Sequence, residues 1–226
     1  PLNVHEDALA HFRKAIERGL EQENEWKTLV EGYIKKNAEL GALWQETVSG
    51  ELPADWEKHL PTFDDAEAMA TRVAGGKVIN ALAPHMPTLI GGSADLSPST
   101  DTELKDFESF TNTNHSGRNF HFGIREHAMG AVLNGMALTK GIIPYGATFL
   151  IFSDYMRPPI RLAAIMKIRP IFIYTHDSIG LGEDGTTHQP VEQLIGLRSV
   201  PGLIVIRPAD ANETVQAWRV TLEHKG

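Results

Sequence analysis

Cysteine is absent from this chain of 226 residues, which excludes both a disulfide framework and a zinc site built on cysteine. No apolar run approaches the roughly 20 residues of a membrane-spanning helix, and no signal peptide is visible. A basic surplus is also lacking, because 21 Lys and Arg residues stand against 29 Asp and Glu residues, and a nucleic-acid-binding surface needs such a surplus. We therefore expect a protein that binds neither a membrane nor nucleic acid.

The chain is long enough for one large domain or one and a half, and its acidic charge is confined to one part. Residues 1–67 hold 7 basic and 15 acidic residues, whereas residues 68–226 hold 14 of each. A balanced charge is what we expect of a domain that docks on other domains. The chain starts with Pro1 rather than Met and stops soon after a predicted helix begins, so we expect it to be a piece of a longer protein.

The first part of the chain is predicted to be a helical arm followed by a linker. Residues 5–49 place apolar side chains at close to the 3.6-residue period of a helix. Two prolines then interrupt helix propagation, so residues 50–64 are predicted to be a linker. We expect the arm and linker to occupy residues 1–64 and a separate α/β domain to occupy residues 65–226.

The second part alternates between helices and short apolar strands. The predicted strands are residues 88–90, 119–122, 142–145, 170–175 and 203–206. The predicted helices are residues 65–82, 124–140, 153–167 and 190–198. Alternation of this kind is typical of an α/β fold with an open, mostly parallel sheet flanked by helices.

Polar, glycine-rich clusters are predicted to follow the carboxyl ends of these strands. They are residues 91–95, 123–126, 147–149, 175–178 and 207–210. In open α/β sheets, ligands bind outside the carboxyl ends of the strands. The clusters therefore predict a binding edge, although ordinary turns between strands and helices also favour Gly, Asp and Ser.

The segment from Gly180 to Gly185 matches the G-x-G-x-x-G pattern of nucleotide-binding loops. Its spacer contains two acids, Glu183 and Asp184, which would repel a pyrophosphate. We therefore interpret the segment as a flexible loop that can present Asp184 and His188 to a neutral polyol.

Two further groups of residues allow two interpretations each. Phe149, Phe152 and Tyr155 are spaced by three, which favours an aromatic core stripe on one helical face, although a flat heteroaromatic ring could also stack there. Asp95 either caps a turn or binds a ligand, and Ser99 is either a turn residue or a phosphate donor.

Glu126 lies at the start of an apolar predicted helix, directly after a predicted strand. Acids are favoured in the first turn of a helix, where they meet the positive end of its dipole, and from the residue alone this interpretation is favoured. The alternative is a carboxyl group held ready for proton chemistry.

Four segments together resemble the transketolase family over essentially the whole chain. They are Gly91–Ser99, Gly123–Gly130, Pro144–Phe149 and Thr175–Pro190. Residues 65–226 are similar to most of the pyrimidine-binding domain of that family, and residues 1–60 to the helical end of the preceding pyrophosphate-binding domain.

The resemblance implies thiamine diphosphate as cofactor. It implies that Glu126 shares a proton with a pyrimidine ring nitrogen, which lets the cofactor deprotonate its own thiazolium carbon. Phe149, Phe152 and Tyr155 match the pocket around the pyrimidine, and Asp95 matches a position close to the cofactor.

The resemblance also implies transfer of a two-carbon ketol unit from a ketose phosphate to an aldose phosphate. His176, Asp184 and His188 match positions that hydrogen-bond the sugar, with His188 also counted as catalytic, while Arg72 and Ser99 match positions that hold its phosphate. A related ketol transferase, such as a dihydroxyacetone synthase, and a non-catalytic assembly module are the alternatives.

The remaining implications concern what lies outside these residues. In the family, the diphosphate and a divalent cation, Mg²⁺ or Ca²⁺, are held by a preceding domain with a Gly-Asp-Gly motif, so we expect no metal ligand in this chain. We also expect a cytoplasmic homodimer with the site between subunits, and a chain that is inactive alone.

Overall fold

The computed structural model describes residues 3–64 and 68–225. The chain divides into two units, Pro1–Glu46 and Thr47–Gly226, which are described separately. The predicted boundary between residues 64 and 65 stays a prediction, because it falls next to residues 65–67, which lie outside the described residues.

The first unit is helical, as predicted, but its helix is interrupted. Helix α1 (Glu6–Lys36) ends at Asn37, whose φ of −130° and ψ of 74° are not helical, and helix α2 (Ala38–Ser49) follows. No described residue of α1 is buried within the structure. Phe12 and Ile16, which belong to the predicted apolar face, are 75% and 69% exposed.

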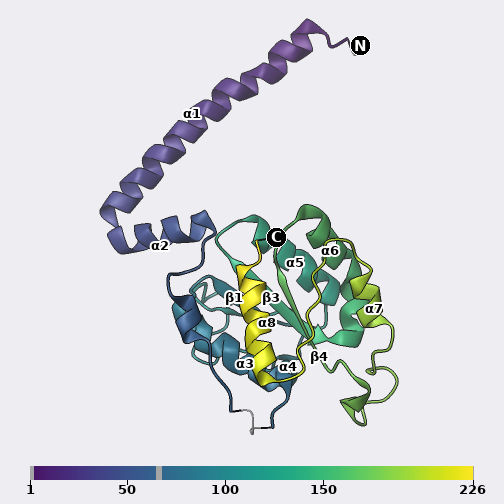
Figure 1. Ribbon diagram of the computed structural model, residues 1–226. Coiled ribbons are helices and arrows are strands. Elements are labelled where there is room, and N and C mark those ends of the chain that lie inside the picture. Colours follow the sequence, from purple (N-terminus) through teal and green to yellow (C-terminus); the bar gives the residue numbers. More distant parts are fainter. Residues whose placement is uncertain (1–2, 65–67, 226) are drawn as a thin grey trace. The chain divides into compact units, whose positions relative to one another are not determined.

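The second unit contains a four-stranded sheet in which all neighbouring strands are parallel (Figure 1). Its strands are β1 (Leu89–Ser93), β2 (Asn119–His121), β3 (Ile143–Phe149) and β4 (Ile171–Thr175). They lie in the order β2-β1-β3-β4. The open parallel sheet predicted from the alternation of strands and helices is thereby confirmed.

The predicted fifth strand over residues 203–206 is wrong. These residues form no strand, although Leu203 and Val205 do pack against the core. The side chains that alternate with them, Ile204 and Ile206, are 53% and 42% exposed. A run of four apolar residues predicts a strand, whereas here only alternate residues face the core and no ladder with a described strand forms.

The helices of the second unit are α3 (Thr71–Leu82), α4 (Ser97–Thr100), α5 (Glu126–Leu138), α6 (Ser153–Met166), α7 (Gln193–Arg198) and α8 (Ala211–Glu223). Four of them, α3, α5, α6 and α7, lie where helices were predicted, with shorter bounds, whereas α4 and α8 lie outside the predicted ranges. The helix predicted over residues 65–82 begins only at Thr71, since residues 68–70 are not helical. The helix predicted from residue 190 begins at Gln193, whose side chain accepts a hydrogen bond from the Val191 N–H.

Four short 3₁₀ helices complete the described elements of this unit. They are η1 (Trp56–His59), η2 (Ala83–His85), η3 (Leu150–Phe152) and η4 (Ile179–Leu181). The predicted linker over residues 50–64 is therefore not featureless. It contains η1, and Trp56 of η1 is only 7% exposed because it joins the hydrophobic core.

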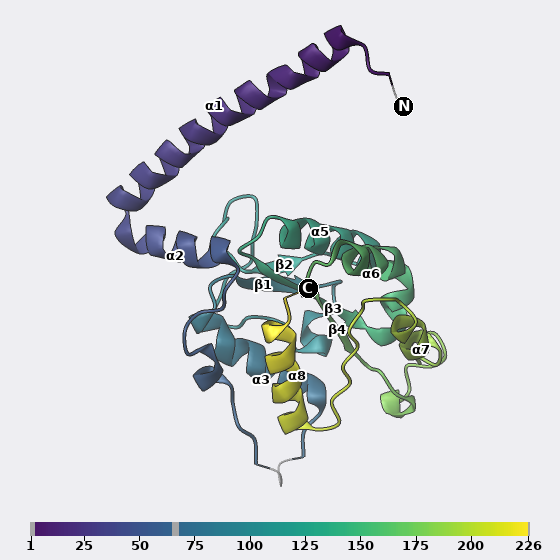
Figure 2. The same ribbon diagram turned by 45° about the horizontal axis from the view of Figure 1, so that its top comes forward.

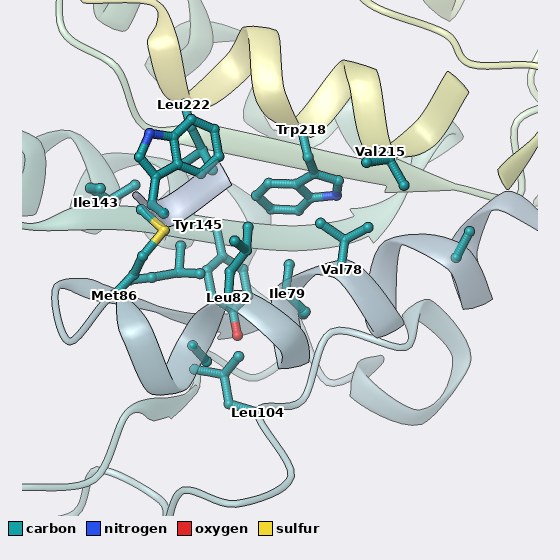
Figure 3. Close-up of a cluster of buried hydrophobic side chains, with 14 of the residues drawn as sticks. Val78, Ile79, Leu82, Met86, Leu104, Ile143, Tyr145, Val215, Trp218 and Leu222 are labelled. Carbon is teal, nitrogen blue, oxygen red and sulfur yellow. The ribbon is translucent and has the colours of Figure 1, made fainter. Parts of the chain in front are cut away.

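Helices cover both faces of the sheet, with α3 and α8 on one side and α5 and α6 on the other (Figure 2). The first core cluster joins α3, α8 and the sheet, and Figure 3 shows Trp218 and Val215 of α8 pointing toward Val78 and Leu82 of α3. Tyr145 of β3 lies fully buried in this cluster and donates from its hydroxyl to the Thr102 carbonyl at 2.8 Å.

The second core cluster lies on the other face of the sheet. Met129 and Leu133 of α5 pack there with Met156 and Ile160 of α6. All four side chains are at most 1% exposed, which fixes the start of α5 firmly against β3. The residue at that start, Glu126, is therefore carried by a rigid element.

Candidate functional site

The carboxyl ends of the parallel strands meet at one edge of the sheet. From β1 the chain crosses first to β2 on one side and then to β3 on the other. The carboxyl ends of the neighbouring strands β1 and β3 thus form a topological switch point, where open α/β sheets bind ligands. The residues discussed below lie on β3 and β4, on the segments that follow β1 and β4, and on helices α3 to α6.

Two of the predicted glycine-rich clusters are parts of strands rather than turns after them. Gly91–Ser93 lies inside β1, and Ala147–Phe149 lies inside β3, because both strands extend further than predicted. At Gly92 a Cβ atom would overlap the Phe120 carbonyl oxygen of the neighbouring strand. The glycine there allows close strand packing instead of forming a loop.

Glu126 is the first residue of α5, and it is only 7% exposed. Thr148 of β3 donates from Oγ1 to Glu126 Oε1 at 3.3 Å. In the described part of the chain, no cation forms an ion pair with this carboxyl group. The dipole of α5 favours an acid here, but a dipole alone does not require burial, and burying a carboxyl without a cation is costly.

Tyr174 of β4 belongs to the same surroundings, although the sequence analysis did not single it out. It is the register partner of Thr148 across β3 and β4, so the two side chains lie on the same face of the sheet. Its hydroxyl is buried and has no hydrogen-bond partner among the described residues. Burial raises the pKa of Tyr174, and the negative charge of Glu126 raises it further.

Aromatic and imidazole rings gather beside the end of β3. Phe149 stacks on His176 with 3.7 Å between ring centroids and on Phe152 at 5.8 Å, while His188 meets the ring of Phe152 edge-on at 5.3 Å. Tyr155 lies 6.0 Å from Phe152 but is 65% exposed. The structure thus brings both predicted histidines to the predicted aromatic residues.

The interpretation of the three aromatic residues as a core stripe on one helical face is wrong. Phe149 ends a strand, Phe152 lies in a 3₁₀ helix and Tyr155 lies in α6. Only Phe149 is buried. The spacing of three indicated one helix, whereas the chain changes from strand to helix within these seven residues.

His176 follows β4 and adopts a left-handed backbone conformation with φ of 54°. Its Nδ1 lies 2.8 Å from Thr175 Oγ1. Burial lowers the pKa of His176 and the charge of Arg72 lowers it further, while Asp184 and Asp177 act in the opposite direction. Arg72 and Asp184 therefore both act electrostatically on this ring, and their roles at one site stay predictions.

The other predicted residues are placed as follows. Arg72 lies in the first turn of α3, with Nε 3.7 Å from Asp101 Oδ2. Ser99 lies in α4 and is half-buried, and Asp95 is exposed with φ of 65°. No hydrogen bond in the described part of the chain joins the side chain of Asp95 or Ser99 to Glu126, so their roles stay predictions.

The segment from Gly180 to Gly185 forms a loop, as predicted. After η4, Gly182 and Gly185 adopt φ of 98° and 83°, and the next helix begins only at Gln193. The strand-to-helix turn of a dinucleotide site is not formed here.

Among residues 3–64 and 68–225, no group of three or more His, Asp or Glu side chains is arranged to hold a metal ion. No helix in the same ranges is long and apolar enough to cross a membrane.

The chain is similar to transketolases along nearly its whole length. It is 52% identical to the transketolase of Aquifex aeolicus over 222 residues, which cover 98% of this chain and 32% of the relative, and 48% identical to that of Halalkalibacterium halodurans, with coverage of 99% and 34%. The solved transketolase of Leishmania mexicana superposes with a TM-score of 0.92 at 44% identity, covering 99% of this chain and 33% of that one.

The chain thus spans about a third of the length of the curated relatives it matches. The family model described as "Transketolase, pyrimidine binding domain" matches residues 67–226. Since this match covers well over half of the chain, the chain belongs to the transketolase family through its pyrimidine-binding domain.

Proposed function

We propose that the chain supplies the pyrimidine-binding half of a transketolase active site, which transfers a two-carbon ketol unit from a ketose phosphate to an aldose phosphate. The observation that carries the proposal is Glu126, an acid buried at the start of α5, where it accepts a hydrogen bond from Thr148 next to the carboxyl end of β3. A transketolase from Pichia stipitis solved in complex with sedoheptulose 7-phosphate superposes with a TM-score of 0.94 at 40% identity, which supports sugar phosphates as substrates.

The residues at this edge fit the aminopyrimidine of thiamine diphosphate. Phe149 and Phe152 offer aromatic faces to a flat ring, and Tyr174 offers a buried hydroxyl that lacks a partner among the described residues. When bound, thiamine diphosphate supplies a thiazolium carbon that becomes nucleophilic after losing a proton and then stores a carbanion. Thr148 occupies Glu126 Oε1, so we place the proton that Glu126 shares with the pyrimidine ring at Oε2.

His176 and His188 each contact the threonine that directly precedes them. Thr175 Oγ1 lies 2.8 Å from Nδ1 of His176, and Thr187 Oγ1 lies 2.9 Å from Nδ1 of His188. Each threonine directly precedes its histidine and engages Nδ1, so Nε2 of each ring remains to meet a sugar hydroxyl. Asp184 adds an acceptor, and the Arg72 guanidinium suits a phosphate geometrically.

We place the residues that hold the diphosphate and its divalent cation, Mg²⁺ or Ca²⁺, outside this chain. The assembled enzyme is proposed to be a cytoplasmic homodimer whose active sites lie between the subunits. A solved structure titled "Split gene transketolase, inactive beta4 tetramer" superposes with a TM-score of 0.57 at 29% identity, covering 71% of this chain and 50% of that one. Its title supports our expectation that a transketolase part of this kind is inactive alone.

The direct test compares the chain alone with the assembled enzyme. The assembled enzyme is this chain together with the diphosphate-binding part, whether the two are one polypeptide or separate polypeptides. We expect ketol transfer from xylulose 5-phosphate to ribose 5-phosphate only in the assembled enzyme with thiamine diphosphate and Mg²⁺. Turnover by the chain alone would show that the division of the site is misassigned. An assembled enzyme without ketol transfer would contradict the proposed reaction.

Asp184→Ala is expected to damage sugar use more than cofactor binding. Removing one hydrogen bond between a sugar hydroxyl and a charged carboxylate costs roughly 1.5–3 kcal/mol, so we expect KM for the ketose phosphate to rise by about 10–100-fold. The measurement is steady-state kinetics of the assembled enzyme alongside calorimetry of cofactor binding. Glu183→Ala is the matched control, because Glu183 is the neighbouring exposed acid of the same loop. A loss confined to cofactor affinity would refute the role of Asp184.

A further inference from the structure

Arg207 lies between α7 and α8, and its side chain reaches the turn that follows β4. Its Nε donates to Asp177 Oδ2 at 2.6 Å, and its Nη2 donates to the backbone carbonyl oxygen of Asp177 at 3.5 Å. The guanidinium therefore contacts both the side chain and the main chain of the residue directly after His176. Because its donors lie in one plane, such a fork fixes a direction as well as a distance.

The backbone of His176 requires outside support. A left-handed conformation in a residue other than glycine costs on the order of 1–3 kcal/mol and persists only where the surroundings hold it. With φ of 54°, the ring of His176 stacks on Phe149 at 3.7 Å and meets Thr175 Oγ1 at 2.8 Å. The direction of its Nε2 thus depends on a backbone conformation that the residue does not favour by itself.

The segment that carries Arg207 is anchored on both sides. Before it, Leu203 and Val205 pack against the core cluster of α5 and α6. After it, Asp210 caps α8 by accepting a hydrogen bond from the Glu213 N–H at 2.7 Å. Arg207 therefore reaches Asp177 from a fixed base, and not from a free loop.

The contribution of this pair to stability is small, so its role must be sought elsewhere. The side chains of Arg207 and Asp177 are 46% and 36% exposed, and exposed ion pairs contribute about 0–1 kcal/mol. By contrast, misplacing a substrate-binding group by about 1 Å can cost on the order of 10²-fold in rate.

We propose that Arg207 is a positioning residue, which through Asp177 holds His176 in its left-handed turn and directs His176 Nε2 at the sugar. This inference rests on the proposed function, since it takes His176 as a sugar-binding residue. Arg207 directly follows residues 203–206, which the sequence predicts to be a strand and which form none.

The first test is an NMR titration of the 226-residue chain labelled in the histidine rings, with the His176 signal assigned by its loss in His176→Asn. The groups that act on this ring are Arg72, Asp184, Asp177 and His188. Burial is the main reason why the pKa of His176 is lowered. In Arg207→Ala the turn is released and the ring becomes solvated, so we expect this pKa to rise toward that of an exposed histidine, about 6.5.

The second test is kinetic, in the assembled enzyme. Arg207→Ala is expected to raise KM for xylulose 5-phosphate by about 10-fold while leaving the affinity for thiamine diphosphate unchanged. Arg207→Lys keeps the charge but not the planar donors of the guanidinium, so its KM should lie between those of Arg207→Ala and the unchanged enzyme. If Arg207→Ala does not fold, Arg207→Lys is the variant that tests the inference. Arg219→Ala is the matched control, since Arg219 is 41% exposed and donates to Glu57 at 2.7 Å.

An Arg207→Ala protein whose His176 titration and KM equal those of Arg219→Ala overturns the inference. A titration that moves while KM stays unchanged supports the positioning role and contradicts the assignment of His176 to the sugar. The two outcomes separate the failure of this inference from the failure of the proposed function.

Discussion

Glu126→Gln in the assembled enzyme is expected to lower kcat by about 10²–10⁴-fold, the usual contribution of a positioned acid or base. The amide has the size of the carboxyl group and can still accept from Thr148, but it cannot share a proton with a pyrimidine ring nitrogen. Steady-state kinetics at saturating cofactor measure the loss. The rate at which hydrogen at the thiazolium C2 of bound cofactor exchanges with deuterium should fall in parallel, because that is the step at which the proton is needed.

The matched control is Glu39→Gln, which makes the same change at another acid in the first turn of a helix. Glu39 is the second residue of α2 and is exposed, whereas Glu126 is the first residue of α5 and is buried. If Glu126 acted only on the helix dipole, both variants would lose a few tenths of a kcal/mol of stability and keep their activity. Near-normal turnover and C2 exchange in Glu126→Gln would therefore refute the proton-sharing role.

The candidate site could be found from the sequence only in part. Glu126, His176 and His188 stand in segments that resemble transketolases, and the structure places both histidines beside the aromatic residues. Thr148, although inside the predicted cluster 147–149, and Tyr174 are not predicted as site residues, because their importance depends on which residues pair across β3 and β4. That register is set by the packing of the whole sheet.

The fold was predictable to the extent that local pattern determines it. Alternation of helices and apolar strands predicted the parallel sheet, but it could not tell a strand from an extended segment that merely packs. Residues 203–206 show the difference, because they read as a strand and make no ladder with the described strands. Arg207, which directly follows them, donates to Asp177 after β4, so the segment contacts the end of the sheet without being part of it.

Arg118→Ala is expected to destabilise the chain by about 3–5 kcal/mol, a loss at the upper end for single substitutions. Arg118 precedes β2 and is only 8% exposed. Its guanidinium donates to the carbonyl oxygens of Ala83 at 2.8 Å, Met86 at 2.8 Å and Leu89 at 2.6 Å. It also lies 4.0 Å from the centroid of the Phe107 ring.

The expected loss of stability in Arg118→Ala follows from the hydrogen bonds that the substitution removes. Three buried carbonyl groups would lose a charged donor, and hydrogen bonds to charged groups contribute roughly 1.5–3 kcal/mol each. Partial rearrangement and the remaining backbone hydrogen bonds at Ala83 and Met86 reduce the sum. Burial lowers the pKa of Arg118, because the charged guanidinium is removed from water.

Thermal and denaturant unfolding of the chain measure this loss, with about 2–4 °C expected in Tm for each kcal/mol at this chain length. Arg118→Lys should recover part of the stability, since an ammonium group retains the charge but cannot reach three carbonyl groups in one plane. Arg219→Ala, at an exposed arginine, should stay within about 0.5 kcal/mol of the unchanged chain. If Arg118→Ala unfolds no earlier than Arg219→Ala, the guanidinium does not hold η2 and β1 to β2. The position of β1 beside the switch point would then have to come from the apolar contacts of Leu89 and Tyr145 alone.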